Sequence, residues 1–219
     1  TTVRRFIHGV WFHRRWQRCG AIETMIIWID GPFGAGKTTL ATRLCEKRSD
    51  LLVLDPEEIG YVVKTVVAMP PSGNYQDLPF WRRLTVQAIA ELRDHYPQEI
   101  AVPMTLLNPA HRDEIFSAVR SIDSNFIHFY LDVDREILCE RIVGQSMHPD
   151  ESRNEQIRTW RLAQVESCLS AKASLTHETR ILDSGRHDPD TLADIVLRVM
   201  KRLQFASPKL REDRRCSAP

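Results

Sequence analysis

The stretch that decides the fold is MIIWIDGPFGAGKTTLATRL, residues 25–44. It begins with an apolar run typical of a buried strand, breaks into glycines, and continues with helical spacing. Residues 31–38, GPFGAGKT, match G-x-x-x-x-G-K-[ST] and lie between strand and helix, as that motif requires. The stretch therefore predicts a loop that holds the phosphates of a nucleoside triphosphate.

The motif assigns a role to each part of this loop. Its glycines let backbone N–H groups turn toward phosphate oxygens, and the following helix N-terminus attracts negative charge. Lys37 should reach the β- and γ-phosphates, and the Thr38 hydroxyl should ligate Mg²⁺. The predicted nucleotide contacts in the loop are Gly31, Pro32, Phe33, Gly34, Ala35, Gly36, Lys37, Thr38 and Thr39.

Apolar runs and helical spacing alternate along the rest of the chain. Strand-like runs occupy 25–30, 50–55, 99–104, 125–132 and 179–184. Between them lie segments with apolar residues at i, i+3 and i+4, one of which Asp77 is expected to cap. Five such runs separated by helices predict an α/β fold with a parallel sheet covered on both faces.

Composition is that of a globular chain of one ordinary domain, with 219 residues and 42% hydrophobic content. A net charge of +1 gives no electrostatic case for nucleic acid or membrane binding. The five cysteines are scattered, which predicts reduced thiols and a cytoplasmic protein. The amphipathic segment 191–203 could make a peripheral membrane contact, although packing against the sheet is the favoured use of its apolar face.

The chain divides into three predicted parts. Residues 1–24 are rich in arginine and aromatic residues, and they are interpreted as an added or flexible extension, with a targeting peptide as the alternative. Residues 25–206 form the predicted P-loop domain. Residues 207–219 form a charged tail, expected to be frayed. The sequence makes no prediction of oligomeric state.

Motifs in the rest of the chain distinguish between a GTPase, a transport ATPase and a small-molecule kinase. The chain has neither the N-K-x-D and D-x-x-G motifs of a GTPase nor a strand ending in Asp-Glu, as in a transport ATPase. The run 51–60, LLVLDPEEIG, instead places Asp55 where small-molecule kinases hold an acid beside the acceptor hydroxyl. Asp55 is thus a candidate general base or ligand of Mg²⁺-bound water, and the alternative is a helix cap before Pro56.

Residues 132–162 predict a mobile cover over the phosphates. Arg158 and Arg161 lie three apart on one helical face, and they are candidate stabilisers of the transferring phosphate. The alternative is a solvated charged helix. Arg141 and Arg186 are further candidate nucleotide contacts, and the loop 184–188 could cradle adenine or be an ordinary capped connection.

Four short stretches, MIIWIDGPFGAGKT, LDPEEIG, LPFWR and VPMT, together resemble the tunicamycin-resistance P-loop proteins. These are related to the chloramphenicol phosphotransferase and shikimate kinase type of small-molecule kinase, and the similarity covers about 25–203. The resemblance implies a three-layer nucleoside-kinase-like domain with sheet order 2-3-1-4-5, ATP binding, and protection against the nucleoside antibiotic tunicamycin.

The resemblance and the residues together place the acceptor pocket in 57–82. By matching motif, Asp55 is similar to the acid that faces the acceptor in this family, and Arg82 is similar to a residue that contacts substrate or phosphate. Thr105 lies at a strand end, which is expected to be beside the same acceptor cleft. Tyr61 and Phe80 are candidates to stack a flat ring such as uracil. Trp81 is on the apolar stripe of its predicted helix, which favours core packing.

Two functions remain open at this point. The first is an ATP- and Mg²⁺-dependent phosphotransferase that acts on a hydroxyl of a nucleoside-like molecule such as tunicamycin. The second is an ATP-dependent binding protein that sequesters the drug without chemistry. Asp55 and the arginine-rich cover favour the first.

Overall fold

The computed structural model describes residues 24–206. Strands β1 (Ile26–Asp30), β2 (Leu52–Val53), β3 (Ile100–Pro103), β4 (Phe126–Asp132) and β5 (Arg180–Asp183) form a parallel sheet in the order β2-β3-β1-β4-β5. The predicted fold class and strand order are therefore confirmed. The predicted extension 1–24 and tail 207–219 lie outside the described residues, apart from Thr24.

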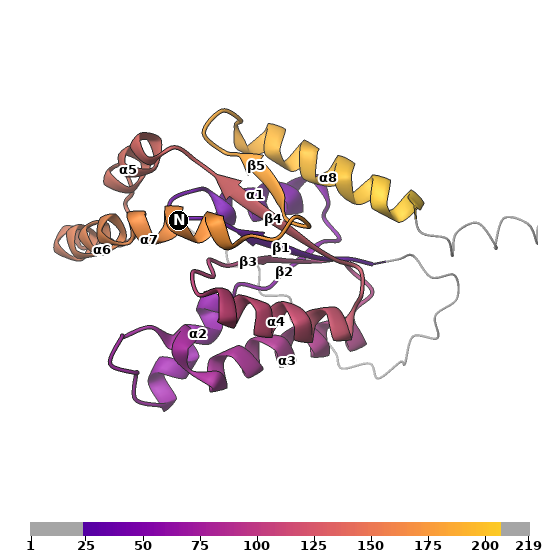
Figure 1. The fold of residues 1–219 in the computed structure, drawn as a ribbon, viewed down its shortest axis with the longest axis horizontal. Helices are drawn as coiled ribbons and strands as arrows, with labels where there is room; N and C mark the ends of the chain where they lie inside the picture. Colours follow the sequence, from indigo (N-terminus) through magenta and orange to yellow (C-terminus); the bar gives the residue numbers. More distant parts are fainter. Residues whose placement is uncertain (1–23, 207–219) are drawn as a thin grey trace, which may run out of the picture.

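Helices cover both faces of the sheet (Figure 1). One layer contains α1 (Lys37–Lys47) and α8 (Pro189–Ala206), and the other contains α3 (Pro79–His95) and α4 (Pro109–Ile122), with α2 (Pro56–Val66) beside them. Three further helices lie beyond one end of the sheet: α5 (Arg135–Val143), α6 (Glu151–Ala163) and α7 (Val165–Ala171). Two short 3₁₀ turns complete the elements, η1 (Tyr75–Asp77) and η2 (Lys172–Ser174).

Strand β1 is apolar on both faces, which is why it lies at the centre of the sheet. Ile27 and Ile29 belong to the core under α1 and α8, whereas Ile26 and Trp28 belong to the core under α3 and α4. The Trp28 indole is fully buried and donates from Nε1 to the carbonyl of Met104 at 3.2 Å. This contact satisfies its polar atom and ties β1 to the end of β3.

The α2–α3 connection differs from its prediction. Asp77 is predicted to cap the helix that contains Trp81, but it lies in η1, and α3 begins two residues later, at Pro79, with Leu78 in the N-cap position. Asn74 caps η1 by accepting from the Gln76 N–H at 3.0 Å, so the chain makes a separate turn before α3. Trp81 is fully buried, which confirms its predicted place in the core.

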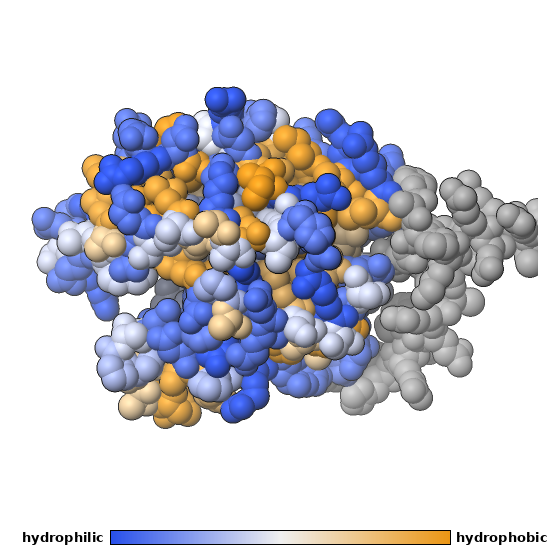
Figure 2. Space-filling model, viewed as in Figure 1, coloured by the Kyte–Doolittle hydropathy of each residue, from blue (hydrophilic) through white to orange (hydrophobic). Residues whose placement is uncertain are grey.

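Surface character differs between the layers. On the face shown in Figure 2, hydrophilic residues predominate over α4, whereas apolar residues are interspersed over α5 and β5. The exposed apolar side chains include Val143 on α5 and Ile181 on β5. Within the described range, none of the helices is both long and apolar enough to cross a membrane.

Candidate active site

The loop between β1 and α1 has the backbone that a phosphate site needs. Gly31, Gly34 and Gly36 have φ values of 140°, 89° and 100°, a region that side chains disfavour. In the described chain, no side chain caps the N-terminus of α1 and its first turn carries no acid. The free N–H groups and positive dipole end of α1 are therefore open to an anion.

Lys37 is directed back across this loop. Its Nζ donates to the carbonyls of Gly31 at 3.0 Å and Pro32 at 2.8 Å. Burial lowers the pKa of Lys37 to about 8, and the charges of Asp30 and Glu57 partly oppose that effect. A lysine held this way can exchange carbonyl contacts for phosphate oxygens.

Asp30 and Thr105 support the loop from below. The Asp30 carboxylate accepts from the N–H of Gly31 at 2.7 Å and from the N–H of Leu106 at 3.1 Å. The Thr105 hydroxyl donates to the Gly31 carbonyl at 2.8 Å and is buried. These contacts give Thr105 a role in holding the loop, and its predicted place beside the acceptor stays a prediction.

Gly31→Ala is expected to destabilise the fold strongly. A Cβ at Gly31 would lie 2.8 Å from the carbonyl oxygen of Leu131, in a backbone conformation that an L-residue rarely adopts. We expect a loss of about 2–4 kcal/mol in the free energy of unfolding, since strain and overpacking add. Gly73→Ala is the matched control, because its φ of 68° is also left-handed but its Cβ meets nothing within 4 Å. Equal losses in urea unfolding of the two variants would contradict this account.

Nucleotide affinity is expected to fall as the pH rises above about 8. The free protein binds nucleotide best with Lys37 protonated, and its pKa is lowered by burial to about 8. Bound phosphate raises the pKa of Lys37. Above pH 8, Lys37 must therefore take up a proton when nucleotide binds, and nucleotide affinity falls by up to about tenfold per pH unit. Titration calorimetry at pH 7, 8.5 and 9.5 checks this. Affinity that is flat over this range, or that rises, would contradict it.

Asp55 is the N-cap residue of α2. Its Oδ1 accepts from the Glu57 N–H at 2.9 Å, so the capping interpretation is confirmed. Burial raises the pKa of Asp55, and the nearby Lys37 charge works against that rise. The charges of Asp55 and Lys37 therefore influence each other. The cap uses Oδ1 of Asp55, so its second carboxylate oxygen can make another contact. Its role as base or Mg²⁺-water ligand remains a prediction.

The α6 helix lies against the loop, as a cover would. The rings of Phe33 and Trp160 have centroids 5.1 Å apart, and the Arg161 guanidinium lies 5.9 Å from the Phe33 centroid. Lys37 Nζ lies 5.7 Å from the same ring. Trp160, Arg161 and Lys37 therefore converge on one loop residue.

Both predicted cover arginines are anchored on the same residue. Arg158 donates to the backbone carbonyl of Gln145 at 3.2 Å and Arg161 donates to its side-chain oxygen. Arg158 also pairs with Glu151, which faces solvent. The two arginines share a helical face, as predicted, and Arg161 is the one that reaches the loop.

The other two predicted nucleotide arginines differ in their surroundings. Arg141 donates to the carbonyl of Ser184 at 2.7 Å and thereby ties α5 to the loop after β5. Arg186 is exposed, with Asp183 as an ion-pair partner at 3.5 Å. Asp188 caps α8 by accepting from the Thr191 N–H at 2.9 Å. This contact agrees with the interpretation of 184–188 as an ordinary capped connection between strand and helix.

The predicted acceptor residues divide into exposed and buried ones. Tyr61 and Phe80 are 55% and 42% exposed and can meet a ligand. Arg82 is buried, and its guanidinium donates to Glu114 at 2.7 Å and to the carbonyl of Gln76 at 2.7 Å. These contacts tie Arg82 to α4 through the partly exposed Glu114, and its predicted contact with substrate stays a prediction.

Glu57 and Trp160 were not among the predicted site residues. Glu57 follows the Asp55-Pro56 cap signature, and such first-turn acids usually only favour the helix dipole. Trp160 stands between the two predicted cover arginines. For Trp160, the ring contact with Phe33 shows that the side chain faces the loop. For Glu57, the evidence is its charge, which raises the pKa of Lys37 against the effect of burial.

The residues present fit a magnesium nucleotide. Within residues 24–206 there is no cluster of three or more His, Cys, Asp or Glu residues that could hold a metal alone. A P-loop magnesium ion needs only a hydroxyl and an acid beside phosphate oxygens. Thr38 is exposed in the first turn of α1, so its hydroxyl is open to such an ion, and the ligand role of Asp55 stays a prediction.

Comparisons with known proteins agree with this geometry. A family model described as "AAA domain" matches residues 26–166. No match is found among the curated proteins.

Three solved structures share the fold. The tunicamycin resistance protein of Deinococcus radiodurans has 20% identity and a TM-score of 0.59, covering 81% of this chain and 96% of its own. A sugar kinase from Janibacter sp. HTCC2649 has 19% identity and a TM-score of 0.57, with coverages of 80% and 93%. The APS kinase of Mycobacterium tuberculosis, in complex with AMPPNP and APS, has 15% identity and a TM-score of 0.56, with coverages of 82% and 98%. The P-loop kinase-like fold is therefore confirmed.

Proposed function

The chain belongs to the AAA domain family, and from that premise we propose that it is an ATP- and Mg²⁺-dependent kinase of a hydroxyl-bearing small molecule. One observation carries the proposal. Lys37 crosses a glycine loop whose helix N-terminus is uncapped, and a cover that bears Arg161 and Trp160 packs on the same loop. A kinase needs both parts, because water must be excluded while charge is stabilised.

Each residue has a definite task in this proposal. The loop amides and Lys37 bind the β- and γ-phosphates, and Arg161 stabilises charge on the phosphoryl group as it moves. Asp55 orients the acceptor hydroxyl and takes its proton late in the transfer. Magnesium, held by Thr38 and phosphate oxygens, supplies charge neutralisation when bound.

We further propose a nucleoside-like acceptor, with tunicamycin as the first compound to test. Support comes from the exposed ring of Tyr61 and from the fold shared with a protein named for tunicamycin resistance. The test incubates protein with ATP, Mg²⁺ and tunicamycin and weighs the drug by mass spectrometry. A gain of one phosphate supports the proposal, and unmodified drug with full ATP binding counts against it.

Drug sequestration without chemistry is the second candidate. The observation that favours it is the hydrogen bond between Asp55 and the Glu57 N–H, since a carboxylate needed as a cap can be retained for stability alone. Tight, ATP-dependent binding of tunicamycin that leaves its mass unchanged would support this candidate.

A further inference from the structure

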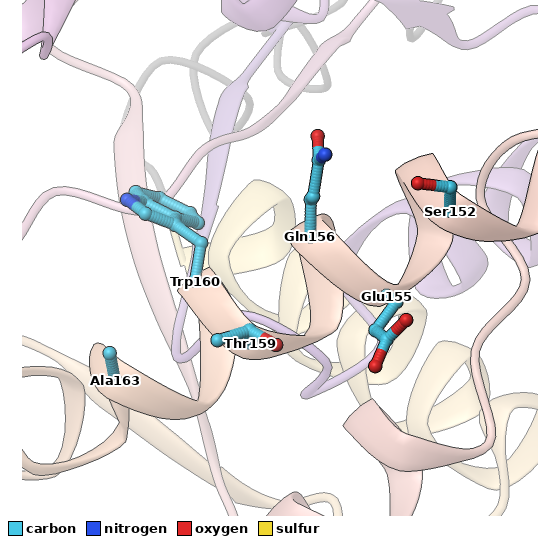
Figure 3. A pocket seen from close by; sticks show the side chains of 6 residues that line it. All are labelled: Ser152, Glu155, Gln156, Thr159, Trp160 and Ala163. Carbon is cyan, nitrogen blue, oxygen red and sulfur yellow. The ribbon is translucent and has the colours of Figure 1, made fainter.

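The phosphate loop is held from two sides. On its outer side, the ring of Phe33 packs against Trp160 of α6, with ring centroids 5.1 Å apart. Figure 3 shows the Trp160 ring extending away from α6, among the side chains that line a pocket along that helix. On its inner side, the loop is held by Asp30, the last residue of β1. The inner contacts come from the sheet, so they do not depend on the cover.

The two carboxylate oxygens of Asp30 have different surroundings. Oδ1 accepts from the N–H of Gly31 at 2.7 Å and from the N–H of Leu106 at 3.1 Å. Oδ2 has no hydrogen-bond partner among the described residues, although the residue is only 2% exposed. A buried carboxylate oxygen without a donor is costly, so a donor is expected beside Oδ2.

His128 is the residue that can supply this donor. It lies on β4, which pairs with β1, and it is 5% exposed. Its Nε2 lies 3.5 Å from Oδ2 of Asp30, and within residues 24–206 this nitrogen also has no hydrogen-bond partner. The two atoms are too close for a water molecule to lie between them, because each hydrogen bond to that water would span about 2.8 Å. They are therefore each other's natural partners.

Two further contacts set the orientation of the His128 ring. Its Nδ1 lies 3.0 Å from the hydroxyl oxygen of Thr179, and its ring meets the Phe116 ring edge to face, with centroids 4.8 Å apart. A carboxylate oxygen can only accept a hydrogen bond, so Nε2 needs a proton to face Asp30 favourably. The Thr179 hydroxyl can donate or accept, so it suits either state of Nδ1.

Resting on the proposed nucleotide-dependent function, we propose that His128 is a positioning residue of the phosphate site that acts through Asp30. The proton on Nε2 binds Oδ2 of Asp30, and this contact holds Oδ1 toward the N–H of Gly31. The carbonyl of Gly31 in turn accepts from Lys37 Nζ at 3.0 Å. His128 thus fixes the residue that Lys37 contacts, without touching nucleotide, so less ordering is needed when phosphate binds.

Nuclear magnetic resonance of the unmodified protein tests the contact itself. Long-range ¹H–¹⁵N spectra of protein labelled at the histidine nitrogens show which ring nitrogens carry protons. The chain has eight histidines, and the signals of His128 are those that are missing in His128→Gln. We expect a proton on Nε2 of His128 at pH 7. An unprotonated Nε2 would overturn the proposal, whatever the variants do.

Two amide variants test the effect of His128 on the phosphate site. His128→Gln places an N–H near the position of Nε2, so the dissociation constant of Mg·ADP should stay within about threefold of the unmodified value. His128→Asn places its amide near the position of Nδ1, where it can contact Thr179 but not Asp30. Its dissociation constant should rise at least about tenfold, because Oδ2 loses its donor. Calorimetry measures both values, and equal affinity in the two variants would overturn the proposal.

Val119→Ala is the control for a general loss of stability. Val119 is fully buried on α4, in the same apolar core as Phe116, and its side chain has no polar atom. This variant should lower the free energy of unfolding in urea and leave Mg·ADP affinity unchanged. If it weakens Mg·ADP binding as much as His128→Asn does, then the effect of His128 is destabilisation alone and the proposal is wrong.

The same samples distinguish this inference from the kinase proposal. Transfer from ATP to tunicamycin is followed by mass spectrometry. An affinity difference between His128→Gln and His128→Asn, without transfer by the unmodified protein, would count against the kinase and keep the positioning role. Transfer by the unmodified protein, with equal nucleotide affinity in the two variants, would do the reverse. An absence of Mg·ADP binding by the unmodified protein would overturn both.

Discussion

Lys37→Met is expected to lower the rate of phosphoryl transfer by about a thousand-fold, the usual effect of removing one preorganised cation or donor from a transition state. Lys37 Nζ spans the loop between the carbonyls of Gly31 and Pro32, so its charge is in place before any phosphate arrives. Methionine keeps the length and apolar stem of lysine but not its charge. The measurement is steady-state transfer from radiolabelled ATP.

Lys47→Met is the control on the same helix. Lys47 lies in the last turn of α1 and pairs with Asp194 at 2.7 Å on α8, far along the helix from the loop. That variant should keep nucleotide affinity and transfer, with little loss of stability, because exposed ion pairs contribute little to folding. Transfer by Lys37→Met within tenfold of the unmodified protein would contradict the assigned role.

Asp55→Asn is expected to lower transfer by about a hundred- to ten-thousand-fold while leaving the fold intact. Asparagine can accept the Glu57 N–H as Asp55 does at 2.9 Å, so the cap survives while the carboxylate is lost. ATP affinity should stay within a few-fold, because the loop and Lys37 are unchanged. The measurements are transfer rate, ATP affinity and thermal unfolding of the same preparations.

Asp55→Ala separates the two roles of this side chain. It should lose transfer as Asp55→Asn does and should also lose about 1 kcal/mol of stability, because the first turn of α2 loses its cap. If Asp55→Asn transfers phosphate normally and only Asp55→Ala is impaired, then Asp55 is a cap alone and the base lies elsewhere.

Much of the fold could be predicted because its local and global signals agree. Strand β1 is apolar at every position before Asp30, and the glycine motif and helical spacing that follow leave little choice of architecture. Edge strand β2 was the least predictable, since only Leu52–Val53 pair where 50–55 looked strand-like. An edge strand forms hydrogen bonds with a neighbouring strand on one side only. The length of its apolar run is therefore a poor guide to where the strand begins and ends.

The site could be predicted only where one motif holds all of its parts. The phosphate loop is contiguous, so its glycines and Lys37 follow from residues 31–38. Arg82 shows the opposite case: its motif predicts a ligand contact, but its ion pair with Glu114 on a different helix is not contained in that motif. Trp160 contacts Phe33 across 127 residues of chain, and such pairs depend on packing that no local pattern contains.

Titration calorimetry of the protein with Mg·ATP tests the central claim most directly, namely that the loop after β1 binds a nucleoside triphosphate through Lys37. The account predicts one site per chain at pH 7, with the heat of binding greatly reduced in Lys37→Met and unchanged in Lys47→Met. An absence of heat with ATP and with the other nucleoside triphosphates, or equal binding by Lys37→Met, would contradict it.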